Sequence, residues 1–179
     1  APRAVHALAV SVGPGSFTGL RVGVVFAKTW TYATGCRLIA VDTLEAAARN
    51  SPSDVNSVWM SSDAQRHDLY VGHYRREGDP SEFRCEGDIA VRSIDEWLAE
   101  LSPGETISGP GADKLEKDRL ESLGLRVLEP MERHRTAGRV AEIAERHLRR
   151  GAFADPWTLE PFYFRKAAAE EVWDNAGRP

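Results

Sequence analysis

The sequence predicts an α/β protein of two lobes, in which the first lobe lacks its opening strands and helix. Two observations support this prediction. The first 50 residues show a strand–helix–strand–helix succession, and three consecutive strand-like segments follow a short polar break, Ser-Pro-Ser-Asp, at residues 51–54. We therefore expect one incomplete lobe over residues 1–50 and a second lobe over residues 51–179.

The expected first lobe is a parallel β-α-β-α unit. Residues 5–12 are rich in β-branched and apolar side chains and end at a glycine turn, which is typical of a buried strand. A helix is expected at residues 17–34, because Gly35 can cap its C-terminus. A second strand at residues 37–41 and a short helix at residues 43–49 complete the unit, with the long helix as the crossover between parallel strands.

The expected second lobe begins with three antiparallel strands. Tyr70 and Tyr74 alternate with Val71 and His73, which is the period of a half-buried strand. The expected strands cover residues 55–62, 68–76, 82–91, 105–108 and 125–128, and the expected helices cover residues 93–101, 112–123 and 136–150. This is the order of an RNase H-like lobe, and the first 50 residues match the end of another. Two such lobes make the actin-like (ASKHA) fold class that we expect.

Composition and charge narrow the class of protein. The chain is 42% hydrophobic and 28% charged, and no apolar run is long enough to span a bilayer. We expect no signal peptide before the first strand, and Cys36 and Cys85 lie far apart, so we expect a cytoplasmic protein with reduced thiols. The net charge is −4, and neither lobe is basic enough to bind nucleic acid unaided.

A glycine-rich turn joins the first strand to the long helix. Its glycines, Gly13, Gly15 and Gly19, surround Ser16 with the spacing G-x-G-x-x-x-G, one residue off the dinucleotide fingerprint. Lys28 is too distant for a Walker loop, and a proline stands where a nucleophile elbow needs glycine. The turn either cradles phosphate or lets the helix pack closely on the sheet, and its spacing favours close packing.

The helix that follows is apolar on almost every side. Such a helix is either fully buried or covered by another chain, and a lobe this incomplete has few residues with which to bury it. We therefore expect a helix-mediated interface, with internal burial as the alternative. The interface candidates are Phe17, Leu20, Arg21, Val24 and Lys28.

Several segments resemble one known family. The stretch AVSVGPGSFTGLRVGVVFAK at residues 9–28 is similar to the most distinctive part of the TsaB (YeaZ) family, and LIAVDTLEA at residues 38–46 continues the match. DAQR at residues 63–66, followed by Leu-Tyr, resembles a later family segment, and EPFYFR at residues 160–165 resembles the closing motif. The resemblance covers nearly the whole chain and implies that the chain is N-terminally incomplete relative to the family pattern.

The resemblance also implies that the chain is not an enzyme. TsaB is similar to TsaD, which transfers the threonylcarbamoyl group to adenosine in tRNA and carries a metal motif, H-x-x-x-H. The matching positions here run from Thr43 to Ala47, which cannot replace imidazoles, and the five histidines of the chain show no such spacing. A glycine-rich phosphate turn of TsaD corresponds to residues 62–66, Ser-Asp-Ala-Gln-Arg. We expect no catalytic residue, no metal and no cofactor.

Two glycines leave an alternative open. Gly109 and Gly111 lie between a strand and a helix, where they form either a vestigial nucleotide-binding turn or a plain tight turn, which is favoured.

The partners that the resemblance implies are a TsaD-like catalytic subunit, paired through the helices of the first lobe, and a TsaE-like ATPase. A homodimer through the same apolar helix is compatible with both, and tRNA would be contacted only indirectly. The alternative function is a metal- or nucleotide-dependent enzyme of the glycoprotease-like superfamily. The missing histidine pair and the altered phosphate turn disfavour that alternative.

Overall fold

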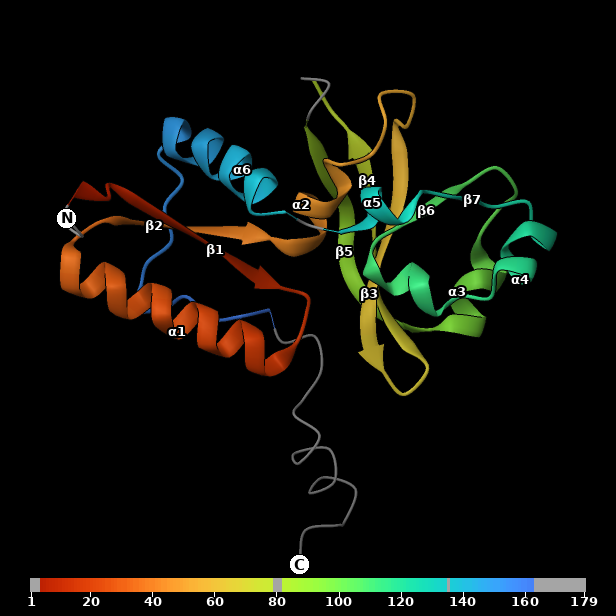
Figure 1. Cartoon of the computed structure of the whole chain (residues 1–179), viewed down its shortest axis with the longest axis horizontal. Coiled ribbons are helices and arrows are strands. Elements are labelled where there is room, and N and C mark those ends of the chain that lie inside the picture. Colours follow the sequence, from red (N-terminus) through yellow and green to blue (C-terminus); the bar gives the residue numbers. More distant parts are fainter. Residues whose placement is uncertain (1–3, 79–81, 135, 163–179) are drawn as a thin grey trace, which may run out of the picture.

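The first lobe is built on two parallel strands. The computed structural model describes residues 4–78, 82–134 and 136–162, so residues 163–165 of the closing motif lie outside the described part. Strand β1 (Ala7–Gly13) pairs with β2 (Arg37–Asp42), with Ala7 opposite Arg37. Helix α1 (Phe17–Thr34) lies on one side of the pair and α6 (Ala137–Arg150) lies on the other (Figure 1).

Local signals explain the ends of α1. The hydroxyl of Ser16 accepts a hydrogen bond from the backbone N–H of Gly19 and so caps the N-terminus. Gly35 has a left-handed backbone conformation, and its N–H donates to the carbonyl of Thr31 at 2.8 Å. Both predicted ends of the helix are confirmed.

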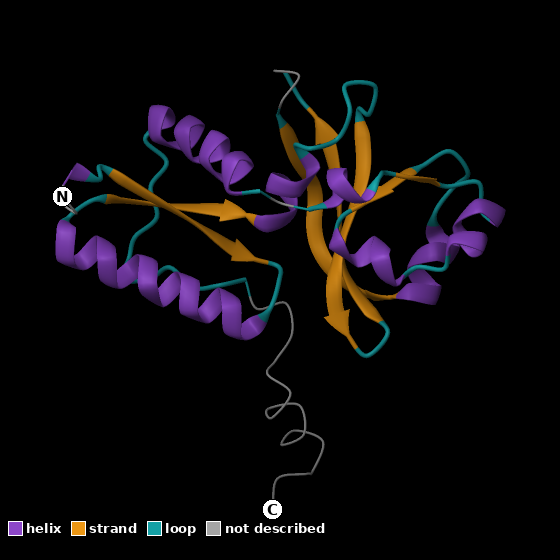
Figure 2. Ribbon diagram, viewed as in Figure 1, coloured by secondary structure: helices purple, strands orange, loops and turns teal. Residues whose placement is uncertain are grey.

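The second lobe is a five-stranded mixed sheet with the order β5-β4-β3-β6-β7. The first three strands are antiparallel, and β6 and β7 join parallel to β3 and to each other, as the RNase H-like order predicts (Figure 2). The strands are β3 (Ser57–Gln65), β4 (Asp68–Arg76), β5 (Phe83–Ser93), β6 (Thr106–Ser108) and β7 (Arg126–Val127).

The helices of this lobe differ from the prediction in two places. The single helix expected at residues 112–123 is a 3₁₀ turn, η2 (Pro110–Lys114), and a helix, α4 (Lys117–Ser122), because Leu115 is extended and packs against the core. A short helix, α5 (Pro130–Arg133), was not predicted, although Pro130 at its first position is a usual start signal. Helix α3 (Ile94–Glu100) matches its prediction.

The end of the described chain returns to the first lobe. Ile143 and Ala144 of α6 pack in one apolar cluster with Ile39 and Val41 of β2. Residues 151–162 then run along the first lobe, where Ala154 N–H donates to the carbonyl of Leu38 at 2.8 Å. We expected all of residues 51–179 in the second lobe, and these contacts instead assign residues 137–162 to the first.

The two lobes meet at α2 (Thr43–Ala48). Leu44, Ala47 and Ala48 of this helix share an apolar cluster with Met60 and Tyr74 of the second sheet. Because this cluster is fully buried, it joins the lobes through apolar packing. In the part of the chain that the structure describes, no helix is both long and apolar enough to cross a membrane.

Candidate functional site

The glycine-rich turn is packed against the protein itself. Gly13 has φ of +119°, a conformation that favours glycine. A β-carbon added there would lie 3.1 Å from Cδ1 of Leu20 and 3.3 Å from the carbonyl oxygen of Phe162. Phe162 itself donates its N–H to the carbonyl of Val12 at 2.7 Å. The turn therefore seats α1 on β1, and the end of the described chain closes over it.

The inner side of α1 contains three of the five residues predicted for the interface. Val24 is 2% exposed and lies on the side of the helix that packs against β1, with Leu20 half-buried beside the glycine turn. Lys28 donates from Nζ to the carbonyl of Leu159 at 3.0 Å. Leu20, Val24 and Lys28 therefore contact other parts of this protein, so the prediction that they lie at a partner interface is wrong. Phe17 and Arg21, the other two predicted residues, are exposed.

The outer side of α1 carries several exposed apolar side chains. Val22 is 64%, Val25 is 55% and Phe26 is 57% exposed. Tyr32 continues the surface and packs edge-on against Trp157, with ring centroids 5.5 Å apart. We call Val22, Val25, Phe26 and Tyr32 the outer face. Sequence reasoning missed this face because a helix with apolar residues on every side carries no signal for which side is covered.

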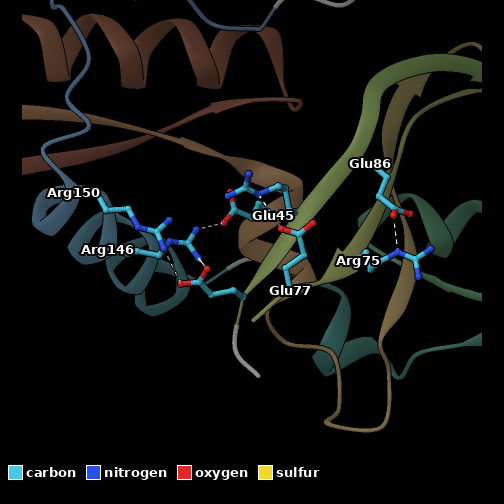
Figure 3. A network of polar contacts seen from close by, with 8 residues as sticks. Glu45, Arg75, Glu77, Glu86, Arg146 and Arg150 are labelled. Atoms are coloured by element: carbon cyan, nitrogen blue, oxygen red, sulfur yellow. Dashed lines mark hydrogen bonds and ion pairs between the residues drawn. The ribbon is translucent and has the colours of Figure 1, made fainter. Parts of the chain in front are cut away.

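A cluster of charged residues lies where the lobes meet. Arg146 of α6 donates to Glu45 of α2 at 2.6 Å and contacts Glu82, just before β5, at 3.0 Å (Figure 3). Arg150 reaches Glu82 at 3.7 Å. With Asp42, these side chains line a cavity of about 370 Å³. The sequence could not predict this cluster, because it joins residues about 100 positions apart.

Asp42 is the most perturbed acid at this junction. It accepts a hydrogen bond from Tyr74 at 2.6 Å, and its other oxygen accepts from the backbone N–H of Leu44 at 2.7 Å. Burial raises the pKa of Asp42 to about 6, although these hydrogen bonds oppose the rise. Burial also raises the pKa of Tyr74 above its usual range, so Tyr74 keeps its proton and is the donor.

The positions that correspond to a metal motif lie on α2. Thr43 and Ala47 are both buried there. Among the described residues, no three His, Cys, Asp or Glu side chains are grouped to hold a metal ion. In the turn that corresponds to a phosphate loop, Asp63 accepts from Lys114 at 2.6 Å and from the N–H of Gln65 at 2.6 Å. The carboxylate of Asp63 is therefore bound by a lysine and by the backbone of its own turn.

Close packing explains the pair of glycines after β6. Gly109 has φ of +95°, and a β-carbon there would lie 2.2 Å from the carbonyl oxygen of Ser61. A β-carbon on Gly111 would lie 2.8 Å from the hydroxyl of Ser61. The backbone of η2 thus approaches β3 too closely for any side chain, which accounts for both glycines without a nucleotide.

Comparisons with known proteins agree with this architecture. A model of the family TsaD, tRNA N6-adenosine threonylcarbamoyltransferase, matches residues 1–109. The structure of YeaZ from Pseudomonas aeruginosa superimposes with a TM-score of 0.75 at 23% identity, over 91% of this chain and 76% of that one. This likeness confirms the predicted actin-like fold class.

Three relatives show how far the sequence similarity extends. The tRNA threonylcarbamoyladenosine biosynthesis protein TsaB of Bacillus subtilis is 36% identical over 75 residues, 42% of this chain and 33% of that protein. TsaB of Escherichia coli is 32% identical over 75 residues, 41% of this chain and 32% of its own length. The match therefore spans about a third of these two relatives. An uncharacterized protein of Mycobacterium tuberculosis is 29% identical over 169 residues, 94% of this chain and 68% of that protein.

Proposed function

Since the chain belongs to the TsaD family and, within it, to the TsaB (YeaZ) group, we propose that it serves threonylcarbamoyladenosine synthesis on tRNA as a scaffold that pairs with a TsaD-like catalytic subunit. In this proposal the partner carries out the transfer, and the chain positions or activates it. In this proposal the tRNA modification takes place in the cytoplasm, and the partner supplies the contacts to the tRNA phosphates.

The outer face of α1 is the observation that carries the proposal. Its apolar side chains are exposed together on one side of a regular helix, and contiguous apolar surface of this kind marks a protein–protein contact. An aromatic residue beside aliphatic ones is also the composition of an interface core. We propose the same face for a homodimer in the absence of the catalytic subunit, because an apolar helix can pair with its own copy about a two-fold axis.

Two features support a role without transfer chemistry. Thr43 and Ala47 occupy the positions that correspond to the metal-binding histidines of TsaD, and neither side chain can ligate a metal as imidazole does. Asp63 occupies the corresponding phosphate turn and is held there by Lys114. A TsaE-like ATPase is the further partner that we propose, and it would supply the nucleotide chemistry.

The test is a charge placed on the outer face. Phe26→Glu should abolish co-elution with a TsaD-like subunit in size-exclusion chromatography, because a carboxylate would be buried in an apolar contact. Met131→Glu is the matched control, because it also replaces an exposed apolar side chain with glutamate. Met131 is 92% exposed and lies on α5 of the second lobe, away from the outer face. Chromatography of each variant alone reports the homodimer.

The results separate the alternatives. Unchanged co-elution of Phe26→Glu, with a circular dichroism spectrum like that of the wild type, would overturn the proposed face. Calorimetry of the isolated chain with zinc and with ATP addresses the enzyme alternative. Tight binding of either would contradict the role as a scaffold without transfer chemistry.

A further inference from the structure

A serine, a histidine and a glutamate form a hydrogen-bonded chain across three neighbouring strands. The hydroxyl of Ser57 in β3 lies 2.6 Å from Nε2 of His73 in β4. Nδ1 of His73 lies 2.9 Å from Oε2 of Glu86 in β5. His73 is the register partner of both Trp59 and Glu86, so the period of two places all these side chains on one face of the sheet.

The charge of Glu86 decides which nitrogen of His73 carries the proton. Nε of Arg75 donates to Glu86 at 2.5 Å, and this bond lowers the pKa of Glu86 below its usual range. The ionised carboxylate can only accept, so Nδ1 of His73 donates to it. Nε2 of a neutral imidazole then has a lone pair, which accepts the hydroxyl proton of Ser57.

Neighbouring side chains fix the imidazole in place. The ring of Trp59 stacks on His73 with centroids 4.5 Å apart and an interplanar angle of 25°. Trp59 is itself anchored, because its Nε1 donates to Glu105 at 2.9 Å. The side chain of His73 is 21% exposed, so its ring is largely covered by its neighbours and still open to solvent.

We propose that Ser57, His73 and Glu86 form a hydrolytic site for small carboxylic esters, separate from the proposed role in tRNA modification. A nucleophile bonded to a base, with the base oriented by a third group, is the arrangement that activates serine hydroxyls. The site lies on the face of the second sheet opposite the one that packs on α2. Figure 3 shows Arg75 and Glu86 on the other side of β5 from Arg146 and Arg150.

The reaction balances without a cofactor. Oγ of Ser57 bonds to the ester carbonyl carbon while its proton passes to Nε2 of His73. The carbon–oxygen bond to the leaving group then breaks, and the leaving alcohol takes that proton. A water molecule then attacks the acyl carbon and gives a proton to Nε2 of His73. The bond from that carbon to Oγ of Ser57 breaks, and Ser57 takes the proton back, which releases the carboxylic acid.

Arg75 holds the carboxylate that orients His73. It is the register partner of Ser57 across β3 and β4, so its guanidinium lies on the same face as the nucleophile. Glu86 is a positioning residue, because it acts through His73.

The experiment uses the full chain with p-nitrophenyl acetate and with a fluorophosphonate probe. We expect the probe to add to Ser57, as mapped by peptide mass spectrometry, and Ser57→Ala to lose the adduct. His73→Gln should slow both labelling and ester hydrolysis by about 100-fold or more, because the general base is lost. Glu86→Gln should lower kcat for the ester and leave KM unchanged, a split that a merely structural role would not produce.

Ser102→Ala is the matched control, because Ser102 is exposed and alanine keeps the backbone N–H that Ser102 donates to Glu105, so this variant should label like the wild type. Absence of an adduct on Ser57 in the folded wild-type protein would overturn the proposal, as would equal labelling of His73→Gln. Ser57→Ala should still co-elute with the TsaD-like subunit, which distinguishes failure here from failure of the proposed function.

Discussion

The hydroxyl of Tyr74 donates a 2.6 Å hydrogen bond to Asp42 and so joins the two lobes at one carboxylate. Asp42 ends β2 of the first lobe and caps α2, whereas Tyr74 lies in β4 of the second sheet and is fully buried. The cap of the junction helix and the contact between the lobes therefore depend on the same side chain. This arrangement makes the junction sensitive to substitution and to pH.

Tyr74→Phe should lower the free energy of unfolding by about 1–3 kcal/mol, because it leaves a buried carboxylate with one partner fewer. The phenyl ring keeps the apolar contacts of Tyr74 with α2, so the effect reports the hydroxyl. Urea denaturation measures the change. Tyr32→Phe makes the same change at a tyrosine that is 74% exposed and should leave the midpoint unchanged. Equal midpoints for the two variants would contradict the importance of the bond.

The raised pKa of Asp42 predicts that stability falls as the pH rises from about 4 to about 6. The unfolded carboxyl has a pKa of 3.8 and the folded one a pKa of about 6, so the native state binds more protons within this window. The contribution is complete below the unfolded value and is lost above the folded value, at most about 3 kcal/mol.

Asp42→Asn tests this dependence, because asparagine keeps an oxygen for the helix cap and does not titrate. The difference in unfolding free energy between the wild type and Asp42→Asn should therefore change across pH 4 to 6 and be level above it. A constant difference, measured by denaturation at each pH, would show that Asp42 titrates normally.

Arg146→Ala should destabilise the protein by about 2 kcal/mol, because it leaves Glu45 and Glu82 without their shared partner in a largely buried place. Arg149→Ala on the same helix removes an exposed pair with Glu145 and should change stability by less than about 0.5 kcal/mol. Thermal unfolding in low salt compares the two. A loss of similar size in both would mean that Arg146 contributes only as a surface charge.

Gly109→Ala should cost at least about 3 kcal/mol, because a methyl group would meet the backbone of Ser61 and force a left-handed alanine. Gly104 also has a positive φ, yet no other part of the described chain lies within 4 Å of a β-carbon there. Gly104→Ala should therefore cost only the backbone strain, about 1 kcal/mol. Melting temperatures of the two variants separate close packing from strain, and a mild effect at Gly109 would reopen the nucleotide interpretation.

The order of strands and helices could be predicted because its signals are local. Ser16 and Gly35 cap α1 within one turn of its ends, and the alternation around Tyr74 predicts a strand whichever sheet it joins. The break at Leu115 was missed, because the helix is interrupted by a contact with the core rather than by a proline or glycine. α5 was missed because a four-residue helix has too few positions to show a period.

By itself, the sequence determined most of the helices and strands of this protein and its two-lobe fold class, because propensity, caps and turn signals act over a few residues. Its glycine-rich stretch also carries the resemblance to one family. Only the tertiary structure decided which side of α1 is exposed, that α6 returns to the first lobe, and that Ser57, His73 and Glu86 form one chain of contacts. A helix with apolar residues on every side gives no sign of which side packs against the sheet. The other contacts join residues between 13 and about 100 positions apart in the sequence. Such contacts exist only once the strands have chosen their partners.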